Sequence, residues 1–328
     1  MHWKGPLIDG VTQSLINKFL ECPYAFYIYA VLGLEEDLPF PDNLMWGDTF
    51  HKGLEILIET KDRETAAEAI KEHLSENYPA APPSYKYSTI KMLDLYNLKR
   101  HMRGDWKAEL VMDQIVSING MPIRFRGKLD GLCEDHDDYG RLLVEHKCKG
   151  YIDPVLVKEE IGQDLQCNIY MYLHDVENVA YDLIKIPEAQ KFGPAPSYGE
   201  SPKEWAEKIF HGPIGSYGGN YPIFKAPHKW VHQHVYLLPR EEQEVYWSTT
   251  VKPIVLRMVE WFEYVTDDSF DIENPESYGP LFYKHPIRHF SGRKTDKFKC
   301  PYHSLLIGES DMDDLIPVSS YFSELENV

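Results

Sequence analysis

The sequence lacks any run of eighteen or more apolar residues, although 43% of its 328 residues are hydrophobic. Without such a run no membrane-spanning helix is expected, and the 13% of aromatic residues indicates a buried core instead. Only five cysteines are present, without a repeated spacing, which argues against a disulfide-stabilised secreted protein. The opening residues, Met-His-Trp-Lys-Gly-Pro, also lack the apolar stretch of a signal peptide. These absences lead us to expect a cytoplasmic protein.

Net positive charge is absent as well, because 52 acidic residues outnumber 34 basic ones and leave a formal charge of −18. An acidic surface repels nucleic-acid phosphates, so the sequence argues against broad coating of a duplex. The basic residues are nevertheless clustered, and this segregation favours narrow contact with the end of a strand. One basic group contains Lys99, Arg100, Arg103 and Lys107, another contains Lys284, Arg288, Arg293, Lys294, Lys297 and Lys299, and the acidic tail contains Glu309, Asp311, Asp313, Asp314, Glu324 and Glu326.

The segment Leu142–Lys147 is the most informative feature that is present. It reads as a short apolar strand that ends in a carboxylate and an ammonium group. Side chains alternate along a strand, so Glu145 and Lys147 share one face and His146 points to the other. Asp130 ends an earlier strand, fifteen residues before Glu145. If the two strands are neighbours, Asp130 and Glu145 can hold one hard cation beside Lys147, an arrangement suited to cutting phosphodiesters. The alternative interpretation is a surface salt-bridge ladder.

This arrangement resembles the motif of the PD-(D/E)XK nuclease superfamily, an Asp followed after a variable gap by Glu/Asp-x-Lys. Three further stretches resemble motifs of its RecB-type exonuclease branch, in the same order along the chain. Residues 14–26 look like S-x-L-x-x-F-x-x-C-P-x-x-F, residues 47–55 are similar to G-x-x-x-H-x-x-x-E, and residues 166–170 match Q-x-x-x-Y. The resemblance covers residues 11–175, with a fainter echo at Cys300. The branch includes CRISPR adaptation nucleases, the nuclease domains of helicase–nuclease repair enzymes and phage-encoded exonucleases.

The resemblance implies an α/β fold with a restriction-endonuclease-like core, in which helices flank a mixed sheet. We expect one nuclease domain over residues 1–328, with an N-terminal helical cover at 11–105 and a catalytic core at 106–180. A long loop, a strand and a C-terminal helical extension would occupy 181–328. Pro23 should bend or interrupt the first helix. The patterns predict helices at 12–32, 43–60, 62–76, 86–103, 157–175 and 240–266, strands at 108–118, 121–133, 141–147 and 229–238, a hairpin turn at 119–120 and a long loop at 187–222.

The resemblance also implies a site for Mg²⁺, with Mn²⁺ as the alternative ion. Asp130 and Glu145 would be its carboxylate ligands, and the backbone carbonyl of His146 a third ligand. His51 would reach the same metal from the N-terminal helices. Glu55 lies four residues later on the same helix face and would fix the ring of His51. A lone histidine on a helix is otherwise a packed or surface residue, and that interpretation stays open for His51.

The remaining motif residues would act on the substrate. Lys147 would orient or deprotonate the attacking water, or neutralise charge that develops on the phosphate. Gln166 and Tyr170 would touch the DNA backbone or a terminal base, with ordinary helix packing as the alternative for Tyr170. The implied activity is that of a metal-dependent DNA exonuclease acting on single-stranded or frayed ends, in DNA recombination and repair or in phage DNA metabolism, within a bacterial or phage-infected cell.

The sequence contains no helicase motif, and it also leaves open a function without catalysis. The chain has no G-x-x-x-x-G-K-[ST] phosphate-binding loop, so a helicase or recombination protein would be a separate partner. The alternative function is that of a weakly active or inactive nuclease-fold protein that binds DNA or assembles with a partner, and the charge of −18 favours it. The intact set of Asp130, Glu145 and Lys147 argues against this alternative.

The cysteines bear on a possible iron–sulfur cluster. Many relatives use one N-terminal and three C-terminal cysteines to bind a [4Fe–4S] cluster, which needs four ligands. Cys22 and Cys300 match two of these positions, whereas Leu305 and Leu306 stand where another cysteine is expected. We therefore expect no iron–sulfur cluster, and we expect the two terminal regions to pack together without one.

Overall fold

The computed structural model describes residues 2–37, 41–81, 83–99, 105–150, 152, 157–186, 230–283, 302, 305 and 311–318. The chain divides into two compact units, each assembled from separate stretches of sequence. The first unit contains Met1–Pro39, Val111–Lys128 and Glu244–Val328, and the second contains Phe40–Leu110 and Leu129–Gln243. The predicted loop at 187–222 lies outside the described residues, as do Arg100, Arg103 and Cys300. In the described parts of the chain, none of the helices has the length and hydropathy needed to cross a lipid bilayer.

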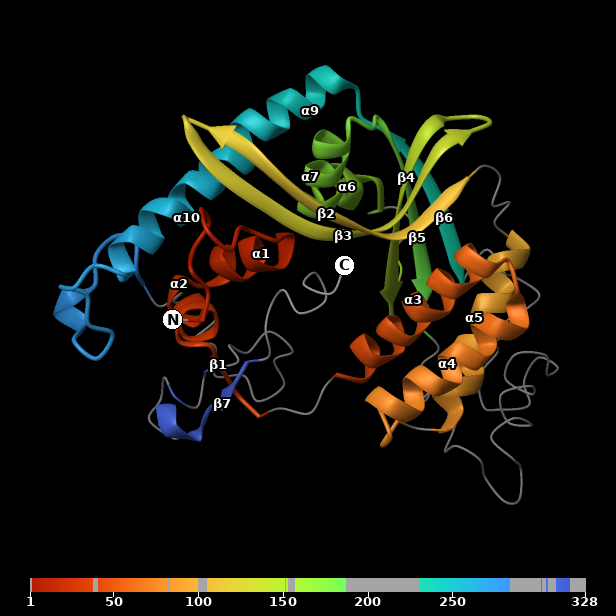
Figure 1. The fold of residues 1–328 in the computed structure, drawn as a ribbon, viewed down its shortest axis with the longest axis horizontal. Helices are drawn as coiled ribbons and strands as arrows, with labels where there is room; N and C mark the ends of the chain where they lie inside the picture. Colours follow the sequence, from red (N-terminus) through yellow and green to blue (C-terminus); the bar gives the residue numbers. More distant parts are fainter. Residues whose placement is uncertain are drawn as a thin grey trace. The chain divides into compact units, whose positions relative to one another are not determined.

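The larger sheet has five strands in the order β2-β3-β4-β5-β6 (Figure 1). Strand β4 runs antiparallel to β3 and parallel to β5, and β5 runs antiparallel to β6. A mixed sheet flanked by helices confirms the predicted fold class. The strands span Trp106–Ile118 (β2), Met121–His136 (β3), Gly140–Lys149 (β4), Asn178–Lys185 (β5) and Val231–Leu237 (β6).

The turn between β2 and β3 confirms the Asn-Gly hairpin signal. Asn119 has φ of 52° and Gly120 has φ of 84°, so both residues adopt the left-handed backbone that a type I′ turn requires. Asn and Gly are the residues that adopt this region most readily. The turn allows two long strands to follow one another, and β3 then carries Asp130 to its place beside β4.

Strand β5 was not predicted from the sequence patterns. Its residues from Val179 to Ile184 are all buried. A strand that is covered on both faces shows no alternation of apolar and polar residues, so the usual strand signal is missing. The parallel register pairs Asp182 of β5 with His146 of β4, which places a carboxylate next to the candidate site.

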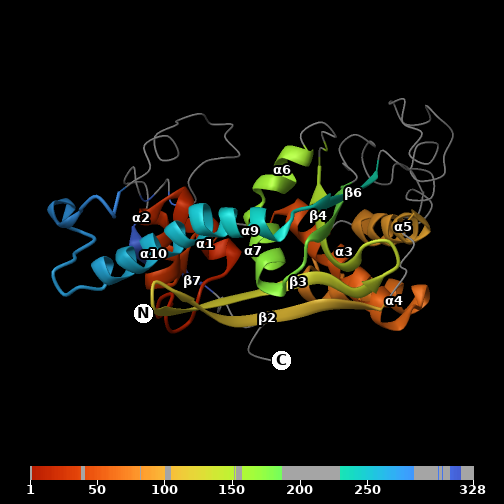
Figure 2. The ribbon, with the colours of Figure 1, turned by 90° about the horizontal axis from the view of Figure 1, so that it is seen from above.

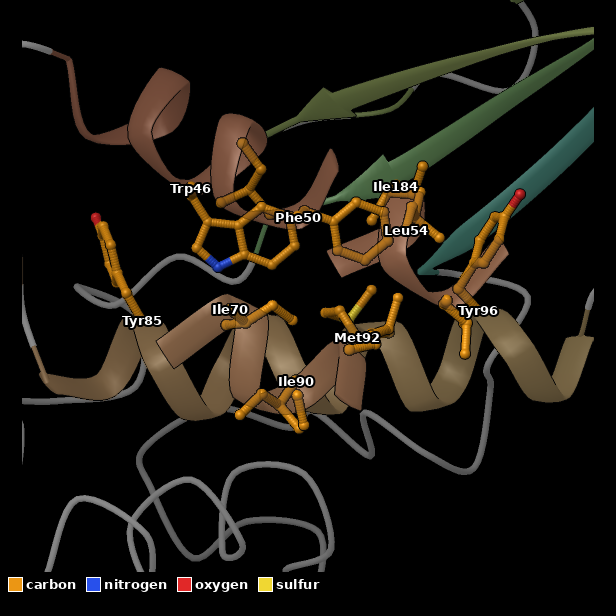
Figure 3. Packing of buried hydrophobic residues seen from close by; sticks show 14 of the residues in the cluster. Trp46, Phe50, Leu54, Ile70, Tyr85, Ile90, Met92, Tyr96 and Ile184 are labelled. Atoms are coloured by element: carbon orange, nitrogen blue, oxygen red, sulfur yellow. The ribbon is translucent and has the colours of Figure 1, made fainter. Parts of the chain in front are cut away.

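Three helices of the second unit share one apolar cluster (Figure 3). They span Asp42–Thr60 (α3), Arg63–Asn77 (α4) and Pro83–Lys99 (α5). Trp46 and Phe50 of α3 stack with ring centroids 5.4 Å apart, and Phe50 meets Tyr96 of α5 edge-on at 6.1 Å. Ile184 of β5 belongs to the same cluster. The cluster therefore fixes α3 and α5 against the sheet, at the position in α3 where His51 follows Phe50.

Two shorter helices lie on the other side of β4 and β5 within the second unit (Figure 1, Figure 2). They span Val157–Gln163 (α6) and Leu165–His174 (α7). Asp164 separates them and caps α7, because its side chain accepts a hydrogen bond from the backbone N–H of Cys167 at 2.9 Å. The single helix predicted at 157–175 is therefore two helices. The cap makes Gln166 part of the first turn of α7.

In the first unit, Pro23 interrupts the helix predicted at 12–32. The backbone of Cys22 is extended, and Pro23 begins a new helix at a position where its missing N–H costs nothing. Thr12 caps the first helix by accepting a hydrogen bond from the backbone N–H of Leu15 at 3.2 Å. The resulting segments span Gln13–Glu21 (α1), Pro23–Phe26 (α2) and Tyr27–Leu32 (η1).

Aromatic side chains join the N-terminal segments of the first unit to a C-terminal helix. The ring of Trp261 lies 5.0 Å from that of Phe26 and 5.6 Å from that of Phe19. Trp3 meets Phe262 at 5.2 Å. The helix predicted at 240–266 contains a π-helical turn, so its segments span Arg240–Tyr246 (α9), Trp247–Val251 (η4) and Lys252–Val265 (α10).

The described ends of the first unit also pack together, as predicted. Strand β1 (Leu34–Glu35) pairs antiparallel with β7 (Ile316–Pro317). The Tyr302 hydroxyl donates a hydrogen bond to the carbonyl of Leu34 at 2.7 Å. The Cys22 thiol donates to the carbonyl of Tyr283 at 3.9 Å. Short 3₁₀ turns at Pro275–Ser277 (η5) and Met312–Asp314 (η6) complete this unit.

The N-terminal segment passes so close to β3 at Gly10 that there is no room for a side chain. A Cβ at Gly10, where φ is +87°, would lie 2.5 Å from the carbonyl oxygen of Arg124, whereas Gly120 has a similar φ of +84° and open space around it. We expect Gly120→Ala to lower the free energy of unfolding by about 1–2 kcal/mol through backbone strain alone. Gly10→Ala should cost at least about 1 kcal/mol more because of the clash. Urea unfolding measures both, and equal losses would contradict the close approach.

Candidate active site

The candidate site lies in the second unit, where β3 and β4 pair. The antiparallel register matches Gly131 with Val144, so the preceding residue, Asp130, comes next to Glu145. The backbone N–H of His146 donates a hydrogen bond to the Asp130 carboxylate at 2.6 Å. The prediction that the two motif strands are neighbours is therefore confirmed.

Glu145 and Lys147 form a closed hydrogen-bonded ring with Gln166 of α7. Lys147 Nζ donates to Glu145 Oε1 at 2.5 Å and to Gln166 Oε1 at 2.8 Å. Gln166 Nε2 donates to Glu145 Oε2 at 3.0 Å. Glu145 is only 1% exposed, so the interpretation as a surface salt-bridge ladder is wrong for this pair. Taking a carboxylate out of water is costly, and these partners offset the cost.

His51 reaches the same site from α3. Its Nδ1 lies 3.4 Å from Asp130 Oδ1, so α3 supplies the imidazole where the resemblance places it. The Glu55 carboxylate accepts a hydrogen bond from Lys52 at 2.7 Å. The expected role of Glu55 in fixing the ring of His51 stays a prediction.

One potential ligand atom from each of His51, Asp130 and His146 lies within 4.8 Å of the others, and among the described residues these form the candidate cation group. Imidazole nitrogens and carboxylate oxygens are suitable ligands for a divalent cation, so the residues present fit such an ion. The carboxylate of Glu145 is held by Lys147 and Gln166. Coordination of the same cation by Glu145 would compete with these two hydrogen bonds.

The sequence interpretation that the His146 side chain lies on the strand face opposite Glu145 and Lys147 is confirmed. Its position on β4 puts its ring on the face opposite Lys147, yet its Nδ1 lies only 3.6 Å from Asp130 Oδ2. Its Nε2 lies 2.8 Å from the hydroxyl oxygen of Tyr96, which itself lies 2.6 Å from Asp182 Oδ2. The sequence analysis missed both partners. A single acidic residue inside the apolar stretch of β5 was the signal that could have identified Asp182, whereas nothing distinguishes Tyr96 from a packing residue.

Burial and charge shift the pKa values of the site in different directions. Burial and the nearby Asp130 carboxylate raise the pKa of Glu145 above its usual value, against the opposing effect of Lys147. Burial alone would raise the pKa of Asp130, but His51 and His146 outweigh it and hold this pKa below its usual value. Burial alone would lower the pKa of Lys147, but Glu145 outweighs it and raises this pKa. Lys147 is therefore a cation at neutral pH, which favours charge stabilisation over proton abstraction.

The predicted DNA contacts differ in their surroundings. Gln166 faces the site through its bonds to Glu145 and Lys147. Tyr170, one turn later, is only 4% exposed, which favours the alternative of ordinary helix packing. A contact of either residue with DNA stays a prediction.

Comparison with known proteins places these residues in a family. A model described as the PD-(D/E)XK nuclease superfamily matches residues 11–207, a range that is more than half of the chain and includes the whole candidate site. No curated protein is similar enough to count as a match. A solved structure described as "Crystal structure of SSO0001" has 12% sequence identity and a TM-score of 0.28, and the match covers 78% of this chain and 87% of that chain. A likeness at this TM-score supports no inference.

Divalent-cation binding is the property of the site that can be measured first. We expect Asp130→Asn and Glu145→Gln each to weaken Mn²⁺ binding by about tenfold or more, because each replaces a charged oxygen ligand. Glu134 is the matched control, since this exposed carboxylate on β3 pairs with Arg141 at 2.7 Å. Titration calorimetry of the three variants gives the comparison. Unchanged Mn²⁺ affinity in both site variants would show that these carboxylates bind no cation.

Proposed function

This chain belongs to the PD-(D/E)XK nuclease superfamily, and from that premise we propose that it is a metal-dependent DNA exonuclease of the RecB-type branch. It would hydrolyse phosphodiester bonds from single-stranded or frayed ends. The observation that carries the proposal is the hydrogen-bonded ring that Lys147 and Gln166 form around the buried Glu145 carboxylate, beside Asp130. An apolar residue would fill the position of Glu145 at a lower cost in free energy, so a buried carboxylate with these partners is best explained by its chemistry.

The proposed roles of the residues follow from their positions. Asp130 and His51 would hold the cation, with Glu145 as a further ligand. A bound Mg²⁺ or Mn²⁺ would stabilise charge on the phosphate and make a nearby water more acidic. Lys147 would donate a hydrogen bond to a phosphate oxygen as negative charge develops there. Gln166 would hold the Lys147 ammonium group in place while Glu145 turns toward the cation.

The substrate would be a strand end. In exonuclease relatives a helical N-terminal part arches over the metal site, and we propose that α3, α4 and α5 form such a cover here. The contact between His51 of α3 and Asp130 supports this role. A separate helicase or recombination protein would supply frayed ends, in DNA recombination and repair or in phage DNA metabolism.

A second candidate function is that of a weakly active or inactive nuclease-fold protein that binds DNA or assembles with a partner. The formal charge of −18 favours it, because phosphate contacts need positive charge. The two functions differ in one observable, cleavage of DNA that depends on the site residues.

Lys147 provides the direct test of catalysis. We expect Lys147→Met to lower the rate of cleavage with Mg²⁺ or Mn²⁺ by about 10²–10³-fold, because a transition-state contact is lost. Lys149→Met is the matched control, since Lys149 is on the same strand and pairs with Glu160 at 2.5 Å; its activity should stay near that of the wild type. Circular dichroism would verify that both variants fold. If Lys147→Met cleaves DNA at the wild-type rate, Lys147 has no role in the mechanism. If neither the wild type nor the variants cleave DNA, the second function is favoured.

The requirement for an end can be tested with matched substrates. A covered site admits a strand only by threading, so we expect linear single-stranded DNA to be degraded and circular single-stranded DNA of the same sequence to survive. Gel analysis with Mg²⁺, with Mn²⁺ and with EDTA gives the result. Comparable degradation of both forms would indicate an open site and an endonuclease.

A further inference from the structure

A polar chain of three residues is buried behind the candidate site in the second unit. It runs from Asp182 on β5 through the hydroxyl of Tyr96 on α5 to the ring of His146 on β4. Asp182 is 0% exposed, and Tyr96 belongs to the apolar cluster of α3, α4 and α5 (Figure 3). Burying a carboxylate and an imidazole among apolar side chains costs free energy. The mechanism proposed above gives none of these three side chains a role.

The directions of these hydrogen bonds decide which ring nitrogen of His146 carries a proton. A carboxylate only accepts, so the Tyr96 hydroxyl donates to Asp182 Oδ2 at 2.6 Å. The same hydroxyl oxygen must then accept from His146 Nε2, 2.8 Å away. The proton of the neutral imidazole is thereby placed on Nε2. Without a cation, a protonated His146 can also direct an Nδ1–H at Asp130, in agreement with the lowered pKa of that carboxyl. When a cation displaces that proton, the Nε2–H tautomer remains and Nδ1 presents a lone pair.

The spacing on the Nδ1 side suits ligands of a single ion. His146 Nδ1 lies 3.6 Å from Asp130 Oδ2, and His51 Nδ1 lies 3.4 Å from Asp130 Oδ1. Adjacent ligands at about 2.2 Å from one metal ion are about 3.1–3.6 Å apart. The two imidazole rings meet edge-to-face with centroids 5.8 Å apart, so both can turn a nitrogen toward the Asp130 carboxylate.

We propose that the imidazole of His146 is a second nitrogen ligand of the cation held by His51 and Asp130, with Tyr96 and Asp182 as positioning residues that orient its ring. This inference rests on the proposed metal-dependent function and adds a ligand that the family motif does not contain, since the motif leaves the residue between Glu145 and Lys147 variable.

The proposed ligand set has a consequence for the choice of metal. Two imidazoles and one carboxylate suit Mn²⁺ and later first-row divalent ions, whereas Mg²⁺ prefers oxygen ligands and water. Ligating histidines commonly donate their other N–H to a fixed acceptor, and loss of that acceptor weakens metal binding by about 10–100-fold. Here the acceptor is the hydroxyl of Tyr96, and Asp182 determines its orientation. The site should therefore bind Mn²⁺ more tightly than Mg²⁺, by about tenfold or more.

Pulsed electron paramagnetic resonance of the Mn²⁺-loaded full chain tests the proposal, because it resolves nitrogen nuclei that bind the ion. We expect two histidine nitrogens on Mn²⁺ in the wild type and one in each of His146→Gln and His51→Gln.

Tyr96→Phe removes only the hydroxyl and should weaken Mn²⁺ binding by about tenfold or more in calorimetry, with a much smaller change for Mg²⁺. Tyr85→Phe is the matched control, since Tyr85 is on the same helix and in the same apolar cluster.

A single nitrogen on Mn²⁺ in the wild type would overturn the proposal, as would unchanged Mn²⁺ affinity in Tyr96→Phe. The wild-type spectrum decides the question even where His146→Gln does not fold. Cleavage of DNA by the wild type with Mg²⁺ tests the proposed function separately. If the protein cleaves DNA but shows one nitrogen on Mn²⁺, the proposed function stands and His146 is not a ligand. If it shows two nitrogens on Mn²⁺ but does not cleave DNA, His146 is a ligand and the proposed function is wrong.

Discussion

The arrangement of the site depends on one charge pair, the buried Glu145 carboxylate and the partly exposed Lys147 ammonium group. Neither charge can be removed from water without compensation, so each needs partners that the surrounding elements hold in place. Helix α7 supplies Gln166 to both charges, and the cap at Asp164 starts that helix where Gln166 can reach them. The pairing of β3 with β4 adds Asp130, whose negative charge helps to raise the pKa of Glu145 above its usual value.

Much of the fold could be predicted from local signals. The Asn119-Gly120 turn and the helix break at Pro23 follow from backbone chemistry that acts within a few residues. Strand β5 could not be predicted in this way, because it is covered on both faces and its sequence lacks the alternation of a half-buried strand. The division of the helix predicted at 157–175 was missed because an Asp inside an amphipathic stretch is equally compatible with an exposed helix position; only the bond from Cys167 identifies Asp164 as a cap.

The residues of the site also differ in whether local sequence signals could predict them. Glu145 and Lys147 share a face because strands alternate, and Asp130 lies beside them because the two strands pair, so physical reasoning from the sequence sufficed for these residues. His51 and Gln166 come from other elements and could be placed only through the resemblance to a family. Alternation placed His146 on the opposite face correctly but did not show that its ring lies near Asp130, because alternation gives the direction of a side chain and not how far it reaches. Its partners Tyr96 and Asp182 come from α5 and β5, and only the packed structure brings them together.

The central claim is that Asp130, Glu145 and the residues around them form a metal centre for phosphodiester hydrolysis. Anomalous diffraction from crystals soaked in Mn²⁺ would locate the ion directly. The account predicts one strong peak about 2.2 Å from a carboxylate oxygen of Asp130 and from a ring nitrogen of His51, with the Glu145 side chain turned away from Lys147 toward the ion. A peak at another position, with the ring of Glu145, Lys147 and Gln166 unchanged, would contradict it.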